Sequence, residues 1–174
     1  MKRRIALGLA LSAALCDCGT LGQPMNPGEF RQAASSSSLA TVERFDAGRP
    51  YQQVVDTLRA KANECLDVAK SSSGAVFQGN MTVTEHSKSV YKPTVSVTER
   101  GMELAVQVSF GNHTLIQKTP PDGLYILVVD ATASGEKSTK LTIYRGNLAK
   151  AKEIGSAIRA WATGERSTCP DLNT

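Results

Sequence analysis

The period of the hydrophobic pattern changes twice along the chain, and these changes constrain its fold more than any other feature. Apolar residues recur at helical spacing over residues 51–68 and again over residues 148–163. Between them, from Phe77 to Tyr144, apolar and polar residues alternate, which is typical of β-strands with one buried face. We therefore predict two amphipathic helices that flank a run of strands in the sequence.

Turn signals divide the alternating segment into consecutive strands. They lie at residues 100–101, 120–123 and 134–137, and strands joined by short turns pair in antiparallel fashion. Residues 124–131 are almost wholly apolar, which predicts a central strand covered on both faces. With a short strand at residues 40–45, the predicted fold is α+β: a mostly antiparallel sheet of about five to seven strands with two helices packed on one face.

Local signals refine the boundaries of these elements. The run Ser-Ser-Ser-Gly at residues 71–74 predicts a break after the first helix. Asn147 is the predicted N-cap of the last helix, and Gly164 is its predicted stop. Residues 114–118 are expected to form a short strand.

The first 15 residues have the pattern of a secretory signal peptide. Met1-Lys2-Arg3-Arg4 is cationic, and the eleven residues that follow are apolar but too few to span a bilayer. The whole chain carries a net charge of +4; three of its 20 basic residues and none of its 16 acidic residues lie in this segment, which leaves +1 after cleavage. With only 5% aromatic residues as well, we expect no nucleic-acid partner.

The signal segment ends at a cysteine. Residues 13–16, Ala-Ala-Leu-Cys, resemble a bacterial lipobox, although Ala13 and Leu15 depart from its usual residues. The resemblance implies lipidation of Cys16, by palmitate among other chains, and attachment to a membrane of the envelope, facing the periplasm. The alternative is cleavage after Ala14, which gives a soluble periplasmic protein. Residues 16–40 are then a flexible tether, and residues 41–174 are one α+β domain with a C-terminal tail.

The other two cysteines lie far apart in the sequence. Cys65 falls on the apolar stripe of the first helix near its end, and Cys169 follows the last helix. If both helices lie on one face of the sheet, the tail can return to the first helix. We therefore predict a Cys65–Cys169 disulfide in an oxidising compartment, with two unpaired thiols as the alternative. Cys16-Asp-Cys18 lacks the spacing of a zinc site, and we expect no metal and no cofactor.

The order of the predicted elements resembles the helix-grip arrangement of START-like ligand carriers. It is also similar to the repeated domain of BamC-type outer-membrane assembly lipoproteins. The segment Gly123-Leu-Tyr-Ile-Leu-Val-Val-Asp-Ala and the ending from Ala160 to Leu172 resemble an uncharacterised family of bacterial envelope lipoproteins. The resemblance implies a place in the envelope without assigning an activity.

Groups suited to catalysis are scattered along the sequence. There is no Gly-x-Ser-x-Gly motif and no phosphate-binding loop, and His86 and His113 lie far apart. We therefore expect a non-enzymatic interaction or structural module that contacts another envelope protein. The alternative is a carrier that binds a lipid or another hydrophobic ligand in a cavity between sheet and helix. Trp161 and the tyrosines are expected to fill the core rather than line such a cavity.

Overall fold

The structure is a computed structural model that describes residues 23–78, 81–111, 119–165 and 168–173. It contains three helices and six strands within these residues. In chain order they are α1 (Pro27–Ser36), β1 (Thr41–Ala47), α2 (Tyr51–Cys65), β2 (Val68–Gln78), β3 (Met81–Thr98), β4 (Gly101–Phe110), β5 (Leu124–Gly135), β6 (Ser138–Arg145) and α3 (Ala149–Thr163).

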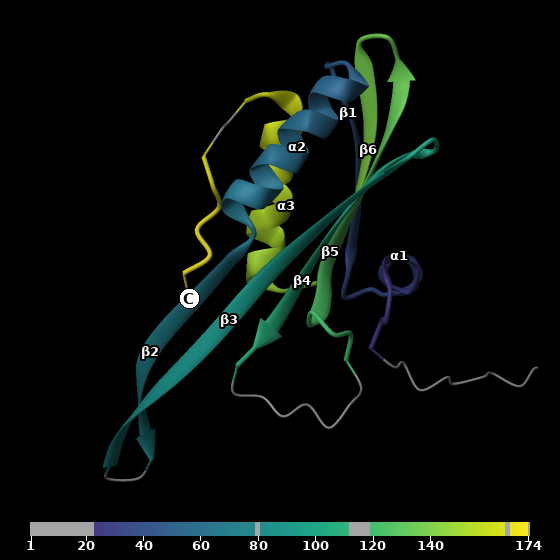
Figure 1. Cartoon of the computed structure of the whole chain (residues 1–174). Coiled ribbons are helices and arrows are strands. Elements are labelled where there is room, and N and C mark those ends of the chain that lie inside the picture. Colours follow the sequence, from purple (N-terminus) through teal and green to yellow (C-terminus); the bar gives the residue numbers. More distant parts are fainter. Residues whose placement is uncertain (1–22, 79–80, 112–118, 166–167, 174) are drawn as a thin grey trace, which may run out of the picture.

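All six strands form one open sheet in the order β1-β6-β5-β4-β3-β2 (Figure 1). Every neighbouring pair is antiparallel, as the short turns predict. The first strand of the chain pairs with the last, so β1 and β2 are the two edges. The β2–β3 hairpin extends well past the helices (Figure 1). The predicted α+β fold with an antiparallel sheet is confirmed.

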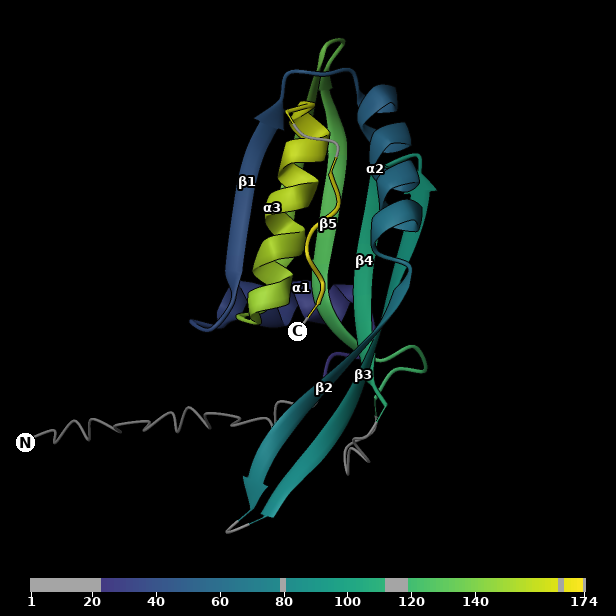
Figure 2. The same ribbon diagram turned by 90° about the vertical axis from the view of Figure 1, so that its left-hand side faces the viewer.

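The helices cover the sheet unequally. The helices α2 and α3 lie side by side on one face, called the front face here, while α1 crosses the opposite, back face (Figure 2). The two helices on the front face are those that the hydrophobic pattern predicts. The space between them and the sheet is filled by large side chains that are less than 2% exposed. These are Trp161, Leu58, Leu66, Leu104, Leu127, Leu141, Ile143, Ile154, Ile158, Leu172, Val54 and Val55.

The helix α1 corrects the expectation of a flexible tether over residues 16–40. Residues 27–36 are helical, so the folded part begins before residue 41. The helix starts at a capping motif: Asn26 accepts a hydrogen bond from the Glu29 amide at 2.9 Å, and the Glu29 carboxylate accepts one from the Met25 amide at 2.7 Å. Pro27 occupies the first helical turn, where its missing N–H costs nothing. Asn-Pro-Gly is thus a helix start here rather than a linker.

Two predicted boundaries also differ from the structure. Residues 71–74 do not form an irregular segment between two elements. They belong to β2, which pairs with β3 without interruption from Val68 to Gln78. This backbone pairing outweighs the weak turn preference of serine and glycine. The N-cap of α3 is Leu148, not Asn147, and it makes no side-chain hydrogen bond. Gly164 ends α3 in the left-handed conformation as predicted, and the strand expected at 114–118 lies outside the described residues.

Gly123 precedes β5 in a conformation that other residues adopt with strain. Its φ is +103°, and a Cβ there would lie 2.3 Å from the Val108 carbonyl oxygen. We expect Gly123→Ala to lower the free energy of unfolding by about 2 kcal/mol or more, measured by urea denaturation. Gly135→Ala is the matched control, since a Cβ there would have no neighbour within 4 Å. Equal stability of the two variants would contradict this explanation.

Tyr51, at the start of α2, buries its hydroxyl group without a hydrogen-bond partner among the described residues. Burial is the main reason why the pKa of Tyr51 is raised above its usual value. A buried hydroxyl without a partner destabilises the fold, so we expect Tyr51→Phe to be as stable as the wild type or up to about 1 kcal/mol more stable. Urea denaturation at neutral pH measures this difference. A clear loss of stability would mean that the hydroxyl does have a partner.

Candidate functional site

On the back face of the sheet, a row of apolar side chains lies next to a row of polar side chains. Strand register places Ala105, Val128, Tyr144 and Val42 side by side across β4, β5, β6 and β1, and we call them the apolar row. The adjacent polar row runs across β3, β4, β5, β6 and β1. Its members are Ser96, Glu103, Asp130, Thr142 and Arg44. At the border between the two rows, the part of the sheet under α1 ends and the uncovered part begins.

The helix α1 covers the apolar row. Phe30 and Ala34, both almost fully buried, form a small core with Ala105 and Val128. The ring of Phe30 lies against Tyr125, with 6.4 Å between the ring centroids. This core is separate from the larger core under α2 and α3. The polar row beyond α1 is left largely uncovered.

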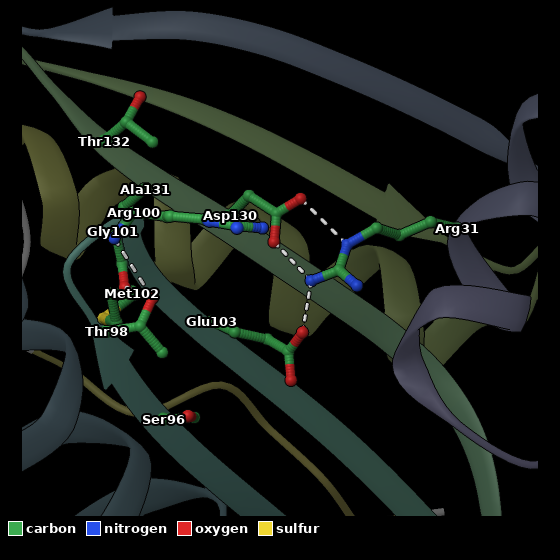
Figure 3. Close-up of a pocket in the computed structure, with 10 residues that line it drawn as sticks. All are labelled: Arg31, Ser96, Thr98, Arg100, Gly101, Met102, Glu103, Asp130, Ala131 and Thr132. Atoms are coloured by element: carbon green, nitrogen blue, oxygen red, sulfur yellow. Dashed lines mark hydrogen bonds and ion pairs between the residues drawn. The ribbon is translucent and has the colours of Figure 1, made fainter.

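Arg31 joins α1 to the polar row. Glu103 and Asp130 lie directly opposite each other on β4 and β5, an arrangement that is unfavourable for two like charges. The Arg31 guanidinium lies between them: its Nε donates to Asp130 at 2.8 Å, and its Nη2 donates to both carboxylates (Figure 3). All three side chains are a quarter to a third exposed. One arginine therefore bridges a cross-strand pair of acids and offsets one of their two charges. We call Arg31, Glu103 and Asp130 the clamp.

The charges of this cluster affect two pKa values. Partial burial lowers the pKa of Arg31, but its hydrogen bonds to Asp130 and Glu103 outweigh this effect and raise the pKa overall. Arg31 is therefore a fixed positive charge at any physiological pH. Burial raises the pKa of Tyr125 beside α1, and the nearby charge of Glu103 adds to the increase. The clamp does not titrate through Arg31 near neutral pH.

A groove of about 460 Å³ lies beside this clamp on the uncovered part of the back face (Figure 3). Its walls come from α1, the ends of β3 and β4 with the turn between them, and β5. The lining residues are Arg31, Ser96, Thr98, Arg100, Gly101, Met102, Glu103, Asp130, Ala131 and Thr132. The groove is thus open, and seven of its ten lining residues carry polar or charged side chains.

The groove contains both hydrogen-bond donors and hydrogen-bond acceptors. Ser96 and Thr132 are exposed, and each of their hydroxyl groups can donate and accept. The Thr98 hydroxyl already donates to the Gly101 carbonyl and accepts from the Arg100 amide. Arg100 adds an exposed guanidinium, and the carboxylates of Glu103 and Asp130 retain acceptor capacity beyond their bonds to Arg31. Positive and negative groups are balanced. This arrangement suits a polar partner with donors and acceptors of its own.

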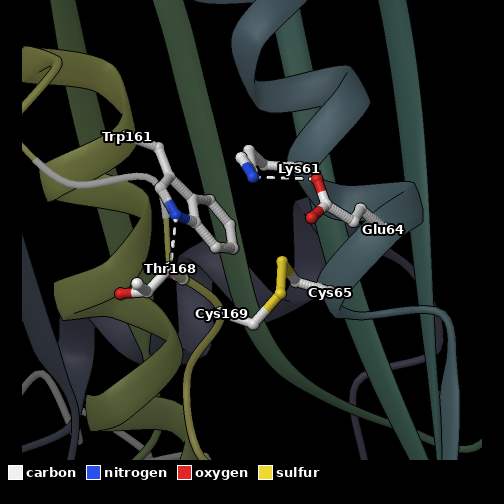
Figure 4. Close-up of a disulfide and its surroundings, with 6 residues drawn as sticks. All are labelled: Lys61, Glu64, Cys65, Trp161, Thr168 and Cys169. Atoms are coloured by element: carbon white, nitrogen blue, oxygen red, sulfur yellow. Dashed lines mark hydrogen bonds and ion pairs between the residues drawn. A yellow bond between two sulfur atoms is a disulfide. The ribbon is translucent and has the colours of Figure 1, made fainter.

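The predicted disulfide is present and lies on the other side of the sheet. Cys65 and Cys169 are bonded with 5.2 Å between their Cα atoms, and the bond links α2 to the C-terminal tail (Figure 4). The Trp161 indole N–H donates to the Thr168 carbonyl at 3.1 Å, and Leu172 is buried beyond the bridge. The tail is therefore held against α3 over residues 168–172. It borders a second hollow, of about 620 Å³, along α3.

Cys16 is the other predicted site residue, and the two histidines were not expected to act in catalysis. Cys16 and His113 lie outside the described residues, and His86 is on β3. Glu64 lies beside the disulfide with ligand atoms within 4.8 Å, but bonded sulfur atoms offer no thiolate to a metal. Among the described helices, none is long and apolar enough to cross a membrane.

The sequence reasoning missed the groove and the residues that form it. In the sequence, Arg31 lies 72 positions from Glu103 and 99 positions from Asp130. Only the strand register brings these three residues together. The capping motif at residues 25–29 was the available signal for α1. The sequence matches no known protein-family model and no curated protein.

Proposed function

We propose that this chain is a lipid-anchored protein of the bacterial envelope whose folded part is a non-enzymatic interaction module. It binds another envelope protein through the uncovered half of its back face. The open groove beside the clamp carries this proposal, because most of its lining residues have polar or charged side chains and the charges of these side chains balance. Polar hydrogen-bonding surfaces of this kind serve specificity in contacts between proteins.

The disulfide supports the proposed compartment. Bonds such as Cys65–Cys169 persist in oxidising surroundings, which include the bacterial periplasm, and are rare in the cytosol. The signal-like residues 1–15 provide the corresponding route of export. Both features support a periplasmic location of the folded part.

The position of α1 limits the distance between the proposed lipid anchor and the folded part of the chain. If Cys16 carries the lipid, only residues 17–26 separate the anchor from α1. Ten residues span at most about 35 Å, at roughly 3.3–3.6 Å for each residue. Because α1 lies on the back face, this limit applies to the face that carries the groove. The module would work close to its membrane, with its partner in or near the same surface.

A carrier function remains the second candidate, and the packing favours it less. A carrier of apolar ligands needs a cavity of several hundred Å³ lined mainly by apolar groups. Between the sheet and α2 and α3, that space holds closely packed side chains such as Trp161, Leu127 and Ile158. Solvent extraction of the purified protein followed by mass spectrometry separates the candidates. A lipid bound in a one-to-one ratio would overturn the interaction module in favour of the carrier.

The anchor is tested by Cys16→Ser. We expect the wild type to fractionate with membranes and to incorporate labelled palmitate, and the variant to lose both properties. If Cys16→Ser fractionates with membranes as before, the lipid anchor is wrong.

The interaction surface is tested by blocking the groove. We expect Thr132→Arg, which places a long cation in the groove, to abolish a specific cross-linked complex in envelopes while the free energy of unfolding stays within about 0.5 kcal/mol. Arg59→Ala on the outer side of α2 is the matched control, because its side chain is 49% exposed. A complex that survives Thr132→Arg unchanged would contradict the proposed surface.

A further inference from the structure

The helix α1 packs on the sheet separately from α2 and α3. Its buried residues belong to a small core of their own, which is distinct from the core under α2 and α3. All six strands pair with one another, and none of the described strands needs α1 to complete its hydrogen bonding. Units with separate cores can open one at a time, at less than the full cost of unfolding.

The helix also depends on its docking site to stay helical. It has ten residues and ends in two serines, whereas isolated helices shorter than about 12–15 residues are marginal in water. Only Phe30 and Ala34 on it are buried. If α1 leaves the sheet, it therefore unfolds and becomes part of the chain between Cys16 and β1.

Arg31 is the charged contact that opposes this release. It bonds to Glu103 and Asp130, which face each other across two strands. Charge-assisted bonds of this kind are stronger than neutral ones, and those that are partly exposed weaken as salt is added. Once Arg31 leaves, the two carboxylates next to the apolar row lose the cation that is hydrogen-bonded to both of them. The surface that is uncovered then fits a segment with a basic residue beside an apolar one.

We infer that α1 is a releasable latch on the back face. Its release uncovers a docking surface for a basic, amphipathic segment of the partner protein and lengthens the tether. The second effect rests on the proposed anchor at Cys16: the chain from the anchor to β1 then comprises residues 17–40 in place of 17–26. Its greatest reach rises from about 35 Å to about 80 Å. The module thus reaches further from its membrane when a partner displaces α1.

Hydrogen–deuterium exchange on the mature full-length chain tests the latch. In the wild type we expect the amides of residues 30–37 to exchange much faster than those of β5 and α3, because α1 opens alone. Arg31→Ala should accelerate exchange in residues 30–37 by about tenfold or more, since hydrogen bonds to charged groups are worth about that factor each. Exchange in β5 and α3 should not change. Arg59→Ala, which removes an exposed arginine of α2, is the control and should alter neither.

A second measurement on the wild type needs no variant. Raising sodium chloride from about 0.1 M to about 1 M shortens the screening length from about 10 Å to about 3 Å and should accelerate exchange in residues 30–37 selectively. Exchange of α1 at the same rate as the slowest amides of β5, or equal acceleration of all elements by Arg31→Ala, would overturn the latch. These readouts do not involve the lipid. Failure of Cys16→Ser to release the chain from membranes would therefore overturn the anchor alone.

Discussion

Replacing both Cys65 and Cys169 by alanine is expected to lower the free energy of unfolding by about 3–5 kcal/mol. The bridge closes a sequence separation of 104 residues, and a loop of this size corresponds to about 4.7 kcal/mol in the chain-entropy treatment. The loss has a structural part as well, because Leu172, which is almost fully buried, belongs to the tail that the bridge fixes. Urea denaturation of the variant and of the oxidised wild type measures the difference.

The matched control for the bridge is the wild type under reducing conditions. Reduction removes the cross-link without changing the side-chain volumes, so it should reproduce most of the loss seen in the double alanine variant. A loss below about 1 kcal/mol in both cases would show that the cross-link contributes little to stability, contrary to its typical 2–4 kcal/mol.

Trp161→Ala is expected to cost about 3–5 kcal/mol. The side chain is 1% exposed in the core between the sheet and the front helices, and truncation of a buried tryptophan leaves a large cavity. It also removes the hydrogen bond from the indole to the Thr168 carbonyl, next to Cys169 (Figure 4). Thermal and urea unfolding give the magnitude. Trp161→Phe, which keeps most of the apolar volume, should cost distinctly less.

The effects of Trp161 and the disulfide should not be additive. Both hold the same tail against α3, so removing either one weakens what the other contributes. In the triple variant we expect a smaller loss than the sum of the two separate losses. Strict additivity would show that the tail is held independently at the two points.

The two helices on the front face were predictable, because their apolar residues recur periodically in the sequence. The apolar stripe that contains Val54 and Leu58 identifies α2, and the stripe that contains Ile154 and Ile158 identifies α3. Their common face on the sheet then brings Cys65 to Cys169, so the disulfide followed from the fold class. Local periodicity, strand alternation and turn residues all agree in this part of the chain.

The helix α1 and the groove on the back face were not predictable, because they lack such periodic signals. The helix α1 buries only Phe30 and Ala34, which is too few residues for a periodic signal, and its serines favour a linker. The groove depends on the register that places Glu103 opposite Asp130, and a shift of one residue would turn either side chain to the other face. Register of this kind is a property of the whole sheet. Composition and motif spacing do not contain it.

Site-specific photo-cross-linking in intact envelopes is the sharpest test of partner binding at the uncovered part of the back face. A photoreactive side chain is placed at Thr132 in the groove, and in a matched chain at Arg59 on the outer side of α2. We expect a discrete cross-linked product of defined mass from position 132 and none from position 59. Products of equal yield from both positions, or a product from position 59 alone, would contradict it.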